Sequence, residues 1–195
     1  LFLTNNPISH PLAEWLAKSA GENVVMCNAK ITVEEIDRIQ PDWIVSYSYR
    51  FLISKNVIEK AKGKIINLHI SYLPWNKGAD PNFWSIVENT PKGVTIHYID
   101  AHLDTGDILL QKSVSFDDES DTLGSSYHKL HDEIQSLFKT NWGKLKMGEI
   151  VAHPQKGEGS FHLKKEFDTI KYILENEGFG MNIKDLKKKY TLLKI

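Results

Sequence analysis

The chain has 195 residues, of which 41% are hydrophobic and 25% are charged. These proportions are ordinary for a globular domain, and the length is sufficient for a hydrophobic core without disulfide or metal support. A formal net charge of −1 provides no overall positive field for binding nucleic acid. The sequence lacks any apolar run near the ~20 residues of a membrane helix, so we expect no membrane association.

The single cysteine, Cys27, excludes an internal disulfide and favours a reducing compartment, so we expect a cytoplasmic protein. Residues 1–4 are apolar, but Asn5, Asn6 and Pro7 end this run at once, which argues against a secretory signal. The chain does not begin with Met, which suggests that the natural start lies upstream. The sequence leaves the oligomeric state open.

Short apolar segments alternate with helix-like segments through the first third of the chain. The patterns predict strands at residues 1–4, 23–28, 42–46 and 64–68, and helices at residues 11–20, 32–40 and 54–61. Ser9, Thr32 and Ser54 occupy positions typical of helix N-caps, and Thr32 with Glu35 forms the capping-box pattern. The alternation predicts an α/β fold, with a mainly parallel, Rossmann-like twisted sheet and helices on both faces.

The later part of the chain has a different pattern. It predicts strands at residues 93–99 and 108–116, a long helix at residues 121–146 and shorter helices near residues 168–175 and 183–190. The segment after Gly148 is polar and rich in turn residues. We therefore expect a catalytic domain over residues 1–150 and a short C-terminal helical appendage over residues 151–195.

Asn67 and His69 are the first candidate site residues. Side chains alternate along a strand, so these two residues point to the same face at the end of the strand predicted for residues 64–68. Pro74 and the turn residues beyond it prevent the strand from continuing. Ligands bind parallel sheets at this carboxyl edge. As single residues, Asn67 and His69 are equally explained as ordinary loop contacts.

Asp104 is the third candidate, in the turn D-T-G-D between the two later strands. The turn alone is a weak signal, but its flanking strand could lie beside that of Asn67 and place Asp104 within reach of His69. An amide that stabilises a developing oxyanion, an imidazole that moves a proton and a carboxylate that orients the imidazole suit the attack of an amine on a carbonyl. The neighbourhood contains no Ser or Cys nucleophile beside a base, which favours direct transfer.

These motifs resemble the folate-dependent formyltransferases. The matching segments are NLHISYLPWNKGADP at residues 67–81 and GVTIHYIDAHLDTGDILLQ at residues 93–111, within a resemblance that spans roughly residues 1–148. The resemblance implies the formyltransferase fold, a catalytic trio of Asn67, His69 and Asp104, and 10-formyltetrahydrofolate as formyl donor, with no metal.

Two loops match the segments that hold the pterin ring in this family. The resemblance assigns cofactor binding to Arg50, Phe51, Leu52, Ile99, Asp100 and His102. An apolar slot with backbone groups at its edge also suits a flat heteroaromatic ring. The alternative for the first loop is an ordinary connection between a strand and a helix.

This sequence differs from two groups of the family, and these differences reduce the number of possible formyl acceptors. The segment TNNPISHPL after the first strand has no glycine for the phosphate loop of glycinamide ribonucleotide formyltransferases. The residues after Gly148 are too few for the large C-terminal domain of methionyl-tRNA formyltransferases, and Ile70 and Trp75-Asn76 differ from both groups. The remaining resemblance is to sugar-nucleotide N-formyltransferases, so we expect a nucleotide-linked amino sugar as substrate.

Trp75 and Lys77 are the expected substrate contacts, through an aromatic face and a positive charge. Phe83 and Trp84 could also contact a sugar or base, or belong to the core. His162, Lys164 and Lys165 could approach a nucleotide or lie in a solvated turn.

Two other classes of protein also fit parts of the sequence, the first of which is a metal hydrolase. His69, His97 and His102 with Asp104 could be metal ligands, but no H-E-x-x-H or similar spacing is present. A non-catalytic folate-binding or nucleotide-binding module is the second rival, although such a module has no need of the three candidate residues together.

Overall fold

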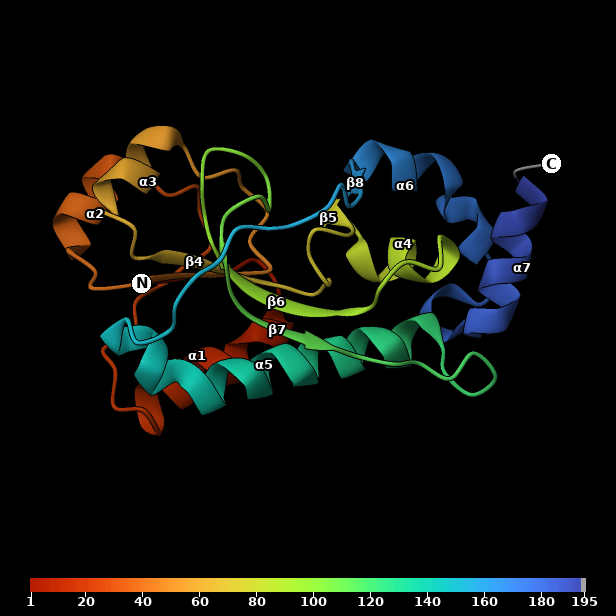
Figure 1. The fold of residues 1–195 in the computed structure, drawn as a ribbon, viewed down its shortest axis with the longest axis horizontal. Coiled ribbons are helices and arrows are strands. Elements are labelled where there is room, and N and C mark those ends of the chain that lie inside the picture. Colours follow the sequence, from red (N-terminus) through yellow and green to blue (C-terminus); the bar gives the residue numbers. More distant parts are fainter. Residues whose placement is uncertain (194–195) are drawn as a thin grey trace. The chain divides into compact units, whose positions relative to one another are not determined.

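The computed structural model describes residues 1–193 and contains one six-stranded sheet (Figure 1). Its strand order is β2-β1-β3-β4-β6-β7. The strands are β1 (Phe2–Leu3), β2 (Met26–Cys27), β3 (Ile44–Tyr47), β4 (Ile65–His69), β6 (Gly93–Tyr98) and β7 (Ile108–Ser113). Strand β1 pairs in parallel with β2 and with β3, and β3 pairs in parallel with β4, so the predicted mainly parallel α/β fold is confirmed.

The chain folds into two compact units. The first consists of Leu1–His69, Ile96–Leu110 and Gln135–Gln155, and the second of Ile70–Thr95, Gln111–Ile134 and Lys156–Ile195. Strands β6 and β7 and helix α5 (Leu123–Met147) contribute residues to both units. The boundary predicted near residue 150 remains a prediction.

In the first unit, helices cover both faces of the sheet. Helices α2 (Val33–Ile39) and α3 (Lys55–Lys60) lie over one face, and α1 (His10–Lys18) lies over the other with the later half of α5 (Figure 1). The face under α2 and α3 buries a core of Leu3, Ile31, Ile36, Ile44, Val57 and Ile65. This burial explains why the predicted strands read as continuous apolar runs.

The helix caps differ in how they are made. Thr32 caps α2 as predicted, because its Oγ1 accepts a hydrogen bond from Glu35 N at 3.4 Å. Ser9 is the residue before α1, but its hydroxyl makes no cap bond and instead contacts Thr4 Oγ1 at 2.6 Å and Asn6 O at 2.8 Å. Ser54 precedes α3 and likewise makes no side-chain cap bond. The local hydroxyl partners of Ser9 compete successfully with the helix N-terminus.

The second unit packs three short helices and the first half of α5 around its own core. These are α4 (Pro81–Val87), α6 (Lys164–Ile170) and α7 (Ile183–Leu193), with 3-10 turns η2 (Lys171–Leu174) and η3 (Gly178–Gly180) between the last two. The core contains Phe83 and Trp84, which are 3% and 5% exposed, together with residues of α5 and α7. Both aromatic residues are therefore core, and substrate contact through their faces is not supported.

A small second sheet, which the sequence patterns do not predict, lies in the same unit. Strand β5 (Lys77–Gly78) pairs in parallel with β8 (Phe161–His162). Lys77 N also donates to Ser160 O at 3.0 Å, so the motif around Lys77 is joined to the C-terminal segment.

Within residues 1–193, none of the helices has both the length and the apolar character needed to cross a membrane.

Candidate functional site

The site begins at the carboxyl end of β4. Ile65, Ile66 and Leu68 are buried and fix the strand in the sheet, where Asn67 lies opposite Ser46 of β3. His69 ends the strand and is 7% exposed, whereas Asn67 is half-buried. The strand therefore presents an amide and an imidazole where it leaves the sheet.

Asp104 reaches both residues from the loop between β6 and β7. Asn67 Nδ2 donates to Asp104 Oδ1 at 3.2 Å, and His69 Nδ1 lies 3.8 Å from Asp104 Oδ2. The Asp104 residue is only 8% exposed, and a buried carboxylate is costly unless polar groups surround it. The structure thus brings the three sequence-predicted residues into one cluster.

A second imidazole, that of His97 in β6, completes this cluster. Its Nε2 lies 3.3 Å from Asn67 Nδ2 and 3.5 Å from Asp104 Oδ1. Its Nδ1 lies 2.8 Å from Tyr98 O, and a carbonyl oxygen can only accept, so Nδ1 carries hydrogen. When the ring is neutral, Nε2 is an acceptor, and Asn67 can then donate one amide hydrogen to His97 and the other to Asp104.

The backbone of the loop that carries Asp104 is sterically constrained. Asp104 adopts a φ of 55°, in the left-handed region that Asp tolerates better than most residues. Gly106 follows, and a Cβ there would lie 2.8 Å from Tyr98 C and closer still to Tyr98 O, so only glycine fits. Asp100 Oδ1 accepts hydrogen bonds from His102 N and Thr105 Oγ1 at 3.0 and 2.7 Å, which closes the loop on itself.

The two loops predicted to hold the cofactor are attached to the same core. Tyr49 and Ile53, on either side of the first loop, pack against the core cluster beneath α2 and α3, and so does Ile99 of the second loop. Leu52 and Leu103 project from the two loops and are 71% and 40% exposed. Exposed apolar side chains on two such loops fit a flat apolar ligand.

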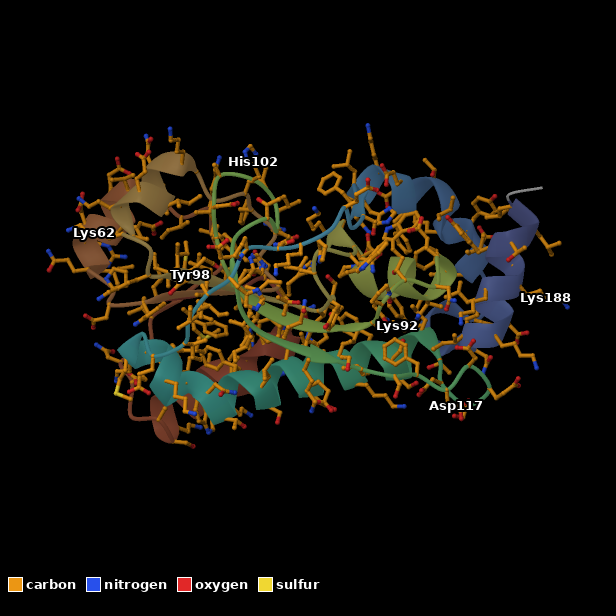
Figure 2. All side chains as sticks on the ribbon, in the orientation of Figure 1. Lys62, Lys92, Tyr98, His102, Asp117 and Lys188 are labelled. Carbon is orange, nitrogen blue, oxygen red and sulfur yellow. The ribbon has the colours of Figure 1, made fainter. Side chains whose placement is uncertain are left out.

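The other predicted cofactor contacts lie on the same loops. Arg50 and His102 are exposed, and His102 lies at the outer end of its loop (Figure 2). The Arg50 guanidinium lies 4.7 Å from the centre of the Phe51 ring. Asp100 is half-buried and uses its carboxylate within the loop, so its part in binding a ligand would come from its backbone.

The predicted substrate contacts Trp75 and Lys77 belong to the second unit and are half-buried. Trp75 is held in its turn by its N–H to Tyr72 O at 3.1 Å and by Ser71 Oγ, which donates to Trp75 O at 2.7 Å.

The residues of the tail motif are engaged within the second unit. His162 is buried, stacks on Trp84 with ring centres 4.1 Å apart, and has Glu88 and Glu166 on its two nitrogens at 3.2 and 3.3 Å. Lys164 pairs with Asp80 at 3.0 Å, whereas Lys165 is exposed. The interpretation that His162 lies in a solvated turn is thus wrong, because its side chain is buried.

Comparison with known proteins identifies the family. The model of the formyl transferase family matches residues 12–140, which is more than half of the chain. The chain belongs to the formyl transferase family.

Three relatives illustrate the range of this family. Methionyl-tRNA formyltransferase of Clostridium tetani is 32% identical over 158 residues, which are 79% of this chain and 51% of that protein. The dTDP-4-amino-4,6-dideoxyglucose formyltransferase of Mycobacterium tuberculosis is 29% identical over 189 residues, which are 91% of this chain and 79% of that protein. The chain thus spans about half the length of the methionyl-tRNA formyltransferases that it matches.

The third is a solved structure, formyltransferase PseJ from Anoxybacillus kamchatkensis in complex with UDP-4,6-dideoxy-4-formamido-L-AltNAc and tetrahydrofolate. It is 40% identical, covers 97% of each chain and superposes with a TM-score of 0.88. This similarity extends over the C-terminal helices as well as the sheet.

Three residues that support the candidate site are not among those predicted from the sequence. The sequence suggests His97 only as a possible metal ligand, although its position at alternate spacing in β6 indicates that it could face the site. Asn5, two residues after β1, accepts a hydrogen bond from Arg50 N at 3.0 Å and so supports the first of the two loops predicted to bind the cofactor. Gln155 contacts the backbone around Asp104 at 2.8 Å and belongs to a segment without periodicity. Within residues 1–193, the structure contains no group of three or more His, Cys, Asp or Glu residues arranged to hold a metal ion.

Proposed function

We propose that this chain transfers the formyl group of 10-formyltetrahydrofolate to the amino group of a nucleotide-linked amino-deoxy sugar. The observation that carries the proposal is the convergence of Asn67, His69 and Asp104 in one cluster at the carboxyl end of β4. The family match supports formyl transfer as the reaction class. The PseJ complex, which contains a UDP-linked formamido sugar and tetrahydrofolate, supports the choice of donor and acceptor.

The proposed chemistry is a direct exchange of carbon–nitrogen bonds. The folate supplies the formyl carbon, which is activated because the nitrogen to which it is bonded also carries an aromatic ring. The acceptor nitrogen forms a bond to this carbon, the bond to the folate nitrogen breaks, and one proton moves from the acceptor nitrogen to the leaving nitrogen. The protein has to hold negative charge on the formyl oxygen and to move that proton.

Asn67 and His69 would stabilise the formyl oxygen, and Asp104 would assist the proton transfer. The amide nitrogen of Asn67 lies within hydrogen-bond distance of both Asp104 and His97. The oxyanion role therefore requires the amide to turn, or to share one hydrogen with the incoming oxygen. Asp104 lies beside both His69 and His97, so it can stabilise positive charge on either ring during the transfer.

The folate would lie on the two loops of the first unit, with Leu52 and Leu103 providing apolar surface and the backbone near Arg50 and Asp100 reading the ring edge. Trp75 and Lys77 remain our proposed substrate contacts. A cytoplasmic location remains a prediction, because the proposed donor and acceptor are both kinds of metabolite that occur inside cells.

Methionyl-tRNA is the second candidate acceptor, because methionyl-tRNA formyltransferases match at 32% to 38% identity. The formal net charge of −1 argues against it, since tRNA binding draws on positive surface. Glycinamide ribonucleotide is the third candidate and has no specific observation in its favour.

The test is an acceptor screen with purified protein and 10-formyltetrahydrofolate. UDP-linked and dTDP-linked 4-amino sugars should be formylated, and methionyl-tRNA and glycinamide ribonucleotide should not. Asn67→Ala, His69→Ala and Asp104→Asn should each remove most activity while the unfolding midpoint stays near that of the parent. Asn141→Asp, in the later half of α5, is the control. Normal turnover by the His69→Ala variant would refute its role, and formylation of methionyl-tRNA alone would overturn the sugar assignment.

A further inference from the structure

Gln155 holds the backbone of the loop that carries Asp104. Its Nε2 donates one hydrogen bond to Asp104 O at 2.8 Å and another to Gly106 O at 3.0 Å. One side-chain amide thus satisfies two carbonyl groups on either side of Thr105. The residue is half-buried and lies after α5, outside any helix or strand.

The segment that carries Gln155 is itself fixed to the start of β7. Ile108 N donates to His153 O at 2.8 Å, and His153 N donates to Ile108 O at 3.0 Å. Because His153 is two residues from Gln155, this bridge places the Gln155 side chain at the loop directly before β7. The backbone next to Gln155 is therefore fixed, so its side chain is held close to the loop that it contacts.

The loop needs such support at Asp104. A non-glycine residue with a φ of 55° persists only where its surroundings hold it. The bond to Asp104 O fixes the peptide plane between Asp104 and Thr105, and the bond to Gly106 O fixes the plane between Gly106 and Asp107. Together they restrain the loop backbone from which the Asp104 side chain projects. Its carboxylate must end 3.2 Å from Asn67 Nδ2 and 3.8 Å from His69 Nδ1.

We propose that Gln155 is a positioning residue, which holds Asp104 in register with Asn67 and His69 without touching the reacting atoms. This inference rests on the proposed role of Asp104 in formyl transfer. A displacement of about 1 Å in a catalytic group can cost about 100-fold in rate. Loss of the two hydrogen bonds should therefore lower kcat much more than it changes substrate binding.

Two variants remove the donors while keeping the length of the side chain. Gln155→Glu replaces the amide with an acceptor, and Gln155→Met replaces it with an uncharged apolar group. Both should lower kcat by about 10- to 100-fold and leave the KM for 10-formyltetrahydrofolate within about twofold. Asn182→Asp is the matched control, because Asn182 Nδ2 also donates to a backbone carbonyl, Glu119 O at 2.9 Å, in the second unit. It should keep the parental kcat.

A double-mutant cycle separates positioning from a general effect on structure. In an Asp104→Asn background, Gln155→Met should change the residual rate by less than about twofold, because its effect acts through Asp104. An equal loss in both backgrounds, or a KM that rises as much as kcat falls, would overturn the inference. If Asp104→Asn keeps full activity, the proposed function fails. If Asp104→Asn is impaired and both Gln155 variants keep the parental kcat, only the role of Gln155 fails.

Discussion

Gly106→Ala tests how closely the geometry of the Asp104 loop controls activity. The added Cβ would lie 2.8 Å from Tyr98 C and closer still to Tyr98 O. Carbon atoms pack best at about 3.5–4.0 Å, so the loop and the end of β6 must separate by about 1 Å. Both contacts are backbone atoms, which cannot move aside as the end of a flexible side chain could.

The expected effects follow from this displacement. Crowding of this kind costs about 1–3 kcal/mol in the free energy of unfolding, which corresponds to a decrease of roughly 3–9 °C in Tm. Because the loop carries Asp104, kcat for formyl transfer should fall by about 100-fold. The measurements are thermal unfolding and the initial rate of tetrahydrofolate release with the acceptor found in the screen.

Gly143→Ala is the matched control. Gly143 lies within α5, and a Cβ there meets nothing within 4 Å among the described atoms. Replacement of an exposed helical glycine by alanine should stabilise the protein by about 0.5–1 kcal/mol and leave kcat unchanged. If Gly106→Ala retained the parental Tm and kcat, the argument that the close approach to Tyr98 fixes Asp104 would be refuted.

Three further changes have measurable consequences. Burial, and then the neighbouring His128, lowers the pKa of His131 from 6.5 to about 4, so the folded protein binds fewer protons than the unfolded chain between these values. The contribution of His131 to the free energy of unfolding should therefore fall by about 3 kcal/mol between pH 7 and pH 4, and the pH-dependent loss of stability in urea titrations should be smaller by about this amount in His131→Gln. Trp84→Ala should cost about 3–5 kcal/mol by leaving a cavity in the second core; a loss under about 1 kcal/mol in urea unfolding would contradict its core role. His97→Ala should lower kcat by about 10-fold or more, and an unchanged kcat would show that the cluster does not need the second imidazole.

The sequence predicted the order and type of the main elements because their signals are local. Alternation along residues 65–69 and the block at Pro74 define where β4 ends, and the capping pattern from Thr32 to Glu35 marks the start of α2. Ser9 has the same local signal, yet its hydroxyl is taken by Thr4 and Asn6. The sequence can thus locate the residue that precedes a helix, but it does not show which groups the hydroxyl of that residue will contact.

The rest depended on pairings between distant segments. Strands β5 and β8 have two residues each, which is too short for any periodicity, and they pair across about eighty residues of chain. The sequence suggested that the strand before Asp104 could lie beside that of Asn67, but the contact of His97 with Asn67 depends on the order of the whole sheet, in which β4 is next to β6. Gln155 reaches its partners across 51 and 49 residues of chain.

The hydrogen bonds of Asn67 bear on how the proposed mechanism would favour the transition state. In this cluster the amide hydrogens of Asn67 already have acceptors, Asp104 Oδ1 and, when the His97 ring is neutral, His97 Nε2. An exchange of this neutral acceptor for the neutral oxygen of a formyl group gains almost nothing, because the two hydrogen bonds are of similar strength. Once the amine attacks, the oxygen carries negative charge and the same hydrogen bond gains about 1–2 kcal/mol.

Stabilisation that arises only as charge develops raises kcat without tightening the ground state. The mechanism therefore predicts a particular signature for Asn67→Ala, in which kcat falls and the KM for 10-formyltetrahydrofolate stays near that of the parent. An increase in KM with an unchanged kcat would mean that Asn67 binds the formyl group before reaction. In that case the hydrogen bonds to Asp104 and His97 would not prevent Asn67 from binding the formyl group in the ground state, and the proposed preference for the transition state would be wrong.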